Sequence, residues 1–101
     1  MVIKKRRIVW DNIAKEYIKN SLQHIKQDSP QNADKVKNTI NLKIKEIPDN
    51  PERYALDKYR LNNEGSYHAF EIYRFRISYF VNDSEIRIVR IRHTNQIPLK
   101  Y

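Results

Sequence analysis

The spacing of apolar residues changes once along this chain, and that change limits the folds open to it. Between residues 11 and 47, apolar side chains recur every three or four positions, which is the period of one helix face. After Tyr54, short runs rich in Tyr, Phe, Ile, Val and Arg alternate with turn residues, which is typical of strands. Helices followed by consecutive strands favour an α+β fold over alternating βαβ units.

Two helices are predicted in the first half. The first begins at Asp11 or Asn12 as its N-cap, and the second begins at Ser29 with Pro30 in its first turn and ends before Pro48. The short joint of Gln27 to Ser29 predicts an antiparallel helical hairpin. The apolar stripes are Ile13, Ala14, Tyr17, Ile18, Leu22 and Ile25, then Ala33, Val36, Ile40, Ile44 and Ile47.

The strands are predicted on both sides of this hairpin. A short basic edge strand is expected within Val2 to Trp10, and a meander follows the helices. Three strands are expected in it: the first leads from Lys58 to Leu61 through residues 62–66 into Tyr67 to Ile72, and the others are Phe75 to Val81 and Glu85 to His93. The expected order is therefore β-α-α-β-β-β, an antiparallel sheet with a two-helix hairpin packed on one face. The length fits one domain over residues 1–101.

The last hairpin allows its register to be predicted. A three-residue loop at 82–84 would pair Val81 with Glu85 and place apolar residues opposite one another on one face. The other face would then pair Arg76 with Arg90 and Arg74 with Arg92. Opposed arginines repel by up to ~1 kcal/mol per pair, so we expect an anion to bind there. In the alternative interpretation, these long side chains simply extend into water.

Composition excludes several classes of site. Without cysteine, the chain has no disulfide, thiolate nucleophile or Cys-based metal site, and its single glycine, Gly65, argues against phosphate-binding glycine loops. No apolar stretch is long enough for a signal peptide or a spanning helix, so a cytoplasmic location is expected. A net charge of +8 suits an acidic partner or a nucleic acid. We expect no cofactor and no metal.

The remaining polar residues give weaker signals. His24 is expected at the surface. His68 is open between cross-strand packing and a functional role, and His93 stands at a strand end where either a functional or a structural role is open. The carboxylates form no evident acid–base pair, and most, with Asp57 among them, are expected to be surface charges. Tyr79 is expected in the core.

Three runs carry a resemblance to a known family. They are GSYHAFE at 65–71, YRFRISY at 73–79 and IVRIRHT at 88–94. With the order strand, two helices and meander, they resemble the RelE/ParE superfamily of toxins from type II toxin-antitoxin systems. This resemblance implies a bacterial toxin that a cognate antitoxin neutralises. RelE-like members cleave messenger RNA on the ribosome without a metal, whereas ParE-like members inhibit DNA gyrase and are not nucleases.

The resemblance also suggests site residues for the nuclease activity, which is the main expectation from the sequence. Arg76, His93 and Tyr101 are the expected catalytic residues, with the ribosome and mRNA as partners. The expected nucleic-acid-binding residues are Lys58, Arg60, Arg74, Arg90 and Arg92. Thr94, Asn95 and Gln96 stand where the nucleases often carry a second arginine. The alternatives are a ParE-like inhibitor of DNA gyrase and a non-catalytic module that binds nucleic acid.

Overall fold

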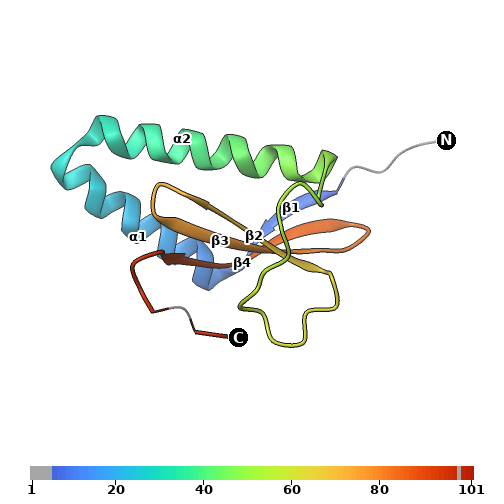
Figure 1. Cartoon of the computed structure of the whole chain (residues 1–101). Coiled ribbons are helices and arrows are strands. Elements are labelled where there is room, and N and C mark those ends of the chain that lie inside the picture. The colour runs from blue at the N-terminus through green and yellow to red at the C-terminus, as the bar shows by residue number, and fades with distance from the viewer. Residues whose placement is uncertain (1–5, 98) are drawn as a thin grey trace.

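The computed structural model describes residues 6–97 and 99–101 (Figure 1). Its elements are β1 (Arg7–Trp10), α1 (Asn12–Asp28), α2 (Pro30–Glu46), the 3-10 turn η1 (Ile47–Asp49), β2 (Tyr67–Ile72), β3 (Phe75–Val81) and β4 (Glu85–His93). The predicted α+β order is confirmed. The first strand begins at Arg7, and the part of its predicted range from Val2 to Lys5 lies outside the described residues.

The four strands form one sheet in the order β1-β4-β3-β2. The pairs β2–β3 and β3–β4 are antiparallel, as the meander predicts, but β1 pairs with β4 in parallel. The expectation of an entirely antiparallel sheet was therefore wrong at one edge. No turn joins β1 to β4, so their relative direction depends on how the helical hairpin crosses the sheet, which residue spacing does not encode.

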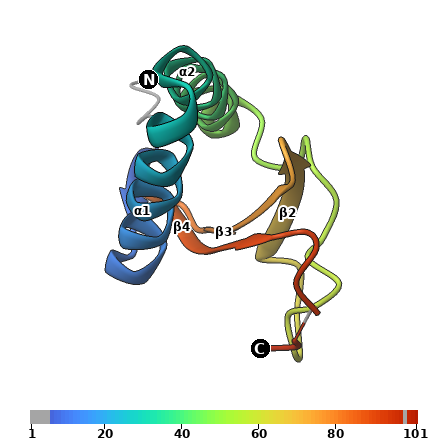
Figure 2. The same cartoon turned by 90° about the vertical axis from the view of Figure 1, so that its left-hand side faces the viewer.

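Both helices pack on one face of the sheet, here called the helix-packed face (Figure 2). All five apolar positions predicted for α2 and its end are buried: Ala33, Val36, Ile40, Ile44 and Ile47. All of these except Ala33 meet Phe75, Ile77 and Tyr79 of β3 in one core, and Tyr79 is fully buried as expected. Ile13 was wrongly placed in the core, because Ala14 takes the inward position and Ile13 is 85% exposed.

Local signals set the ends of the second helix. The Ser29 side chain accepts a hydrogen bond from the Asn32 backbone N–H at 3.2 Å, and Pro30 occupies the first turn, so the predicted cap is confirmed. At α1 the N-cap is Asp11, but its side chain makes no capping hydrogen bond. Instead it forms an ion pair with Arg87 at 2.9 Å, which ties the start of α1 to β4.

The register predicted for β3 and β4 was wrong along the whole hairpin, by one residue near the loop and by two residues beyond Tyr79. Val81 pairs with Ile86, and the Asn82 N–H bonds the Glu85 carbonyl, because the Asn82 side chain accepts from Ser84 and Glu85 and closes a tighter turn. Continued beyond Ser78, the register set by that turn would put Ile77 opposite Arg90 and Phe75 opposite Arg92. A β-bulge between Ser78 and Tyr79 shifts the pairing by one more residue, so that Ile77 pairs with Ile91 and apolar residues again lie opposite one another. As a result Arg76 faces Arg92 rather than Arg90, and Arg90 faces Ser78.

The run Lys58 to Leu61 is not a strand. These residues form turns, and the backbone that continues the sheet past β2 is the preceding segment. There the Ala69 N–H bonds the Ala55 carbonyl and the Asp57 N–H bonds the Tyr67 carbonyl. After Asp57 the chain turns across the other face of the sheet, held by Asn63 side-chain hydrogen bonds to Asp57 and Tyr67. We call this the loop-covered face.

Candidate functional site

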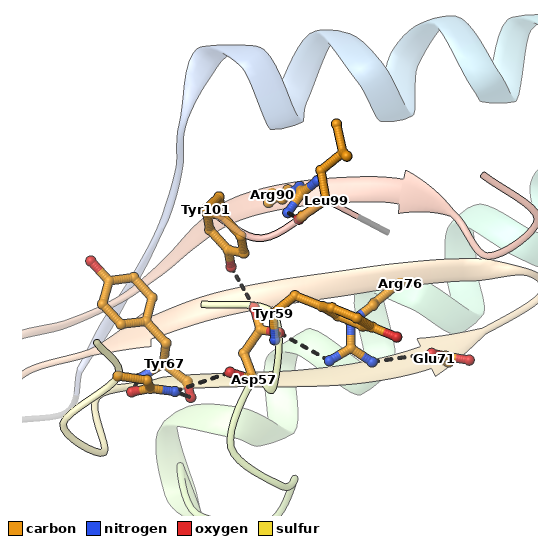
Figure 3. A network of polar contacts seen from close by, with 9 residues as sticks. Asp57, Tyr59, Tyr67, Glu71, Arg76, Arg90, Leu99 and Tyr101 are labelled. Atoms are coloured by element: carbon orange, nitrogen blue, oxygen red, sulfur yellow. Dashed lines mark hydrogen bonds and ion pairs between the residues drawn. The ribbon is translucent and has the colours of Figure 1, made fainter. Parts of the chain in front are cut away.

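Asp57 is the centre of a polar network on the loop-covered face (Figure 3). Its side chain is fully buried, and one carboxylate oxygen accepts from Arg76 at 3.0 Å and from the Tyr59 backbone N–H at 3.1 Å. The other oxygen accepts from the Tyr101 hydroxyl at 2.5 Å. The expectation that Asp57 is a surface charge was wrong, because the turns at 58–61 and the C-terminal residues enclose it.

These contacts change the acidity of the groups in the network. Burial by itself raises the pKa of Asp57, but the hydrogen bonds from Tyr101, Arg76 and Tyr59 outweigh it and hold that pKa below its ordinary value. Burial, together with the hydrogen bond to Asp57, raises the pKa of Tyr101 to about 12. At neutral pH the network therefore contains an ionised Asp57 and a neutral Tyr101 whose hydroxyl donates a hydrogen bond to the carboxylate.

Arg76 is held by two carboxylates. Its guanidinium is 9% exposed and donates to Asp57 and to Glu71, its cross-strand neighbour on β2, at 3.1 Å. The guanidinium also lies 4.7 Å from the centre of the Tyr59 ring. Arg92 lies 5.1 Å from the same ring and is buried as well. Arg76, expected to be catalytic, is thus an internal cation whose charge is balanced within the protein.

The C-terminal residues are fixed to this network. The Tyr101 N–H bonds the Tyr59 carbonyl at 2.9 Å, and the Leu61 N–H bonds the Tyr101 carbonyl at 2.5 Å. Arg90 donates to the Leu99 carbonyl at 2.7 Å. The chain end therefore docks beside the turns at 58–61, and the Tyr101 ring closes over Asp57 (Figure 3).

Two arginines stack on the ring of Tyr101. The guanidinium carbons of Arg90 and Arg60 lie 4.4 Å and 5.1 Å from the centre of that ring, and Arg60 also lies 4.0 Å from the centre of the Tyr67 ring. Aromatic faces attract such cations without neutralising them.

The other predicted site residues are spread over three places. His93 lies on the helix-packed face, where its ring is 4.8 Å from that of Phe75 and 6.1 Å from that of Tyr17. It is therefore on the opposite side of the sheet from the Asp57 network. Arg74 is exposed in the turn between β2 and β3, with a φ of 65°. Lys58 is exposed near the Tyr59 ring.

Six of the arginines fall into two groups by partner. Arg53, Arg76 and Arg87 form ion pairs with carboxylates. Within residues 6–97 and 99–101, no ion pair neutralises Arg60, Arg90 or Arg92, and all three lie against tyrosine rings instead. The opposed arginines predicted from the register thus do not form one anion site. The charge of Arg76 is balanced by two carboxylates within the protein, whereas no carboxylate balances the charge of the stacked arginines.

Sequence reasoning missed Asp57, Tyr59 and Glu71. Glu71 could have been found, because a two-residue turn at Tyr73 and Arg74 pairs it directly with Arg76. Asp57 and Tyr59 carry no such signal, since they stand in a segment without periodicity and reach Arg76 only through the tertiary fold.

The remaining histidines agree with expectation. His24 is exposed. His68 is buried against its cross-strand partner Tyr79, with ring centres 5.4 Å apart, and its Nδ1 donates to the Tyr54 carbonyl at 2.8 Å. In the part of the chain that the structure describes, no three His, Asp or Glu side chains are grouped to hold a metal ion. No helix there has the length and apolar character needed to cross a membrane.

Comparison with known proteins gives two findings. A family model described as the ParE toxin of the type II toxin-antitoxin system parDE matches residues 8–98. A solved structure titled as a chromosomal ParDE toxin-antitoxin system from P. aeruginosa has a similar fold, with a TM-score of 0.67 at 20% identity over 88% of this chain and 96% of that one. No curated protein matches the sequence. With the family model covering nearly the whole sheet-and-hairpin fold, the chain belongs to the ParE family of type II toxin-antitoxin toxins.

Proposed function

We propose that this protein is a ParE-type toxin that inhibits DNA gyrase and does not cleave RNA. ParE toxins pair with a cognate ParD antitoxin, so the partner that neutralises it is expected to be a ParD-type protein. The sequence resemblance left two activities open within the superfamily, and membership of the ParE family favours gyrase over the ribosome.

The observation that carries this proposal is the state of Arg76. Cleaving RNA through its own 2′-hydroxyl requires a cation for the phosphate, together with a base and an acid. Arg76 is the residue best matched to the first role, but its guanidinium is buried and bonded to Asp57 and Glu71. A phosphate would have to displace both carboxylates to reach it.

The expected proton-transfer groups support the same conclusion. The Tyr101 hydroxyl donates to Asp57, and its pKa of about 12 makes it a poor base at neutral pH. His93 lies on the other face of the sheet, against Tyr17 and Phe75. The three groups therefore do not converge on one phosphate, which general acid–base catalysis requires.

The test measures both activities with the same purified toxin. It is added to gyrase with relaxed plasmid and ATP, and separately to a bacterial cell-free translation reaction in which new 5′ ends on the message are mapped. We expect loss of supercoiling with intact message. Addition of the cognate antitoxin should restore supercoiling. Ribosome-dependent cuts in the message would contradict the proposal and support the nuclease activity. No effect in either assay would also contradict it and would favour the non-catalytic module that binds nucleic acid.

A further inference from the structure

Two exposed leucines are linked to Tyr101 through the backbone. Leu61 is 54% exposed and its N–H bonds the Tyr101 carbonyl, and Leu99 is 67% exposed two positions before that residue. Arg90 holds the Leu99 carbonyl, and Arg60 adjoins Leu61 in the chain. Arg60, Leu61, Arg90, Leu99 and Tyr101 are thus linked through the ring and the backbone of Tyr101, and they are here called the loop–tail surface. Figure 3 shows Arg90, Leu99 and Tyr101 of this set.

The loop–tail surface combines available charge with a fixed shape. Arg60 and Arg90 stack on the Tyr101 ring and have no carboxylate partner among residues 6–97 and 99–101. The ring itself is anchored through its hydroxyl to the buried Asp57. Side chains that are already ordered lose little conformational entropy when a partner binds. Tyrosine and arginine are also the residues that most often dominate the energy of protein interfaces.

The leucines indicate what kind of partner fits. A nucleic acid would meet the arginines through phosphates but would leave two exposed leucines without an apolar counterpart. A protein surface can offer carboxylates to Arg60 and Arg90 and an apolar side chain to Leu61 and Leu99 at once. We propose that the loop–tail surface is where this toxin binds gyrase, through an acidic and apolar patch on that enzyme. This inference rests on the proposed function.

The test compares variants of this surface with matched variants on α2. The double variant Leu61→Ser with Leu99→Ser removes the apolar contacts, and Arg60→Glu reverses a charge. The controls are Leu42→Ser, whose side chain is 62% exposed, and Lys35→Glu, which is also exposed. Affinity for intact gyrase and inhibition of supercoiling are measured at 50 and 200 mM salt, with affinity for the antitoxin and the circular dichroism spectrum measured alongside.

We expect gyrase affinity to fall about 10- to 100-fold in both loop–tail variants, as for central interface residues. The α2 controls should stay within about threefold of the parent toxin. Higher salt should weaken the parent toxin more than Arg60→Glu, because that variant has already lost an attractive charge. Retained antitoxin affinity and an unchanged spectrum would show that the variants are folded.

Three outcomes would overturn the inference. If the loop–tail variants bind gyrase as tightly as the parent toxin, the surface is wrong while the proposed function stands. If they lose antitoxin affinity to the same extent, the surface belongs to the antitoxin. If the parent toxin itself neither binds nor inhibits gyrase, the proposed function fails and the inference fails with it.

Discussion

Replacing Asp57 with Asn should destabilise the protein far more than an ordinary substitution in a loop. The change keeps the shape of the side chain but removes the buried negative charge that faces Arg76 at 3.0 Å. Breaking a buried ion pair by removing one partner typically costs about 3 to 5 kcal/mol. Arg76 keeps its second partner, Glu71, and this lowers the cost to the lower end of the range, about 3 kcal/mol. Glu71 does not remove the cost, because its side chain is 53% exposed and screened by water.

The hydrogen bond from Tyr101 adds to this cost. Its acceptor changes from a carboxylate to a neutral amide oxygen, which weakens the bond by about 1 kcal/mol. The expected total is about 4 kcal/mol, a large part of the 5 to 15 kcal/mol that stabilises a typical domain. For a chain of this size the midpoint of thermal unfolding should fall by about 20 °C.

Urea unfolding at pH 7, followed by circular dichroism, measures the effect directly. Asp83→Asn is the matched control, because Asp83 is exposed in the β3–β4 loop and its replacement should change the free energy of unfolding by less than about 0.5 kcal/mol. A change below about 1 kcal/mol for Asp57→Asn would refute the argument that the buried pair holds this face together.

The pH dependence gives a second check on Asp57. Because its pKa is lower in the folded protein than the ordinary 3.8, its stabilising effect is complete above about pH 4 and is lost as the pH falls through the folded value. The difference in stability between the parent protein and Asp57→Asn should therefore shrink in acid. Adding Arg76→Met to Asp57→Asn should recover part of the loss, since the unpaired cation is then gone.

Three further substitutions test other parts of the fold. Ser29→Ala removes the cap of α2 and should lower the free energy of unfolding in urea by about 1 kcal/mol, and no change would deny the cap a role. Ile77→Asp places an unpaired charge at a fully buried position and should abolish the circular dichroism spectrum of the folded protein. A folded variant would contradict the placement of Ile77 in the core. Tyr101 has a pKa of about 12 in the folded protein, so its contribution is complete below about pH 10 and lost as the pH rises through 12. Allowing for screening by water, the parent protein should lose about 1 kcal/mol of stability in alkali, and Tyr101→Phe should not show this loss. If both proteins lose stability equally as the pH rises, the raised pKa of Tyr101 is contradicted.

The helical part of the fold was predictable because its signals are local. The buried positions of α2 follow from spacing alone, and Ser29 and Pro30 mark its start within two residues. The parallel pairing of β1 was not predictable, because it joins residues about eighty positions apart. The β3–β4 register failed for a related reason. The tight turn at Asn82 and the bulge beside Ser78 each shift the pairing by one residue in the same direction, so the apolar residues keep their face while their partners change. A pattern of faces alone does not reveal either shift.

The candidate site shows a similar limit. Alternation along β3 correctly turns Arg76 away from the helices, and from this it was expected to meet an external anion. However, a side chain that leaves the helix-packed face is not necessarily exposed. Here the loop and the C-terminal residues cover the opposite face and bring Asp57 to Arg76. That contact joins residues nineteen positions apart and depends on how the irregular segment before β2 folds back over the sheet, so no local pattern in the sequence could indicate it.

The partners of each arginine decide what the positive charge of this toxin can do. A carboxylate partner balances a guanidinium and makes it structural, as Asp57 and Glu71 do for Arg76. A tyrosine partner fixes the guanidinium but leaves its charge available, as Tyr101 does for Arg60 and Arg90. Asp57 also anchors the ring of Tyr101 through its hydroxyl. The buried Asp57–Arg76 pair therefore supports the ring on which Arg60 and Arg90 stack. Loss of Asp57 should therefore weaken the proposed gyrase contact even though Asp57 itself is buried.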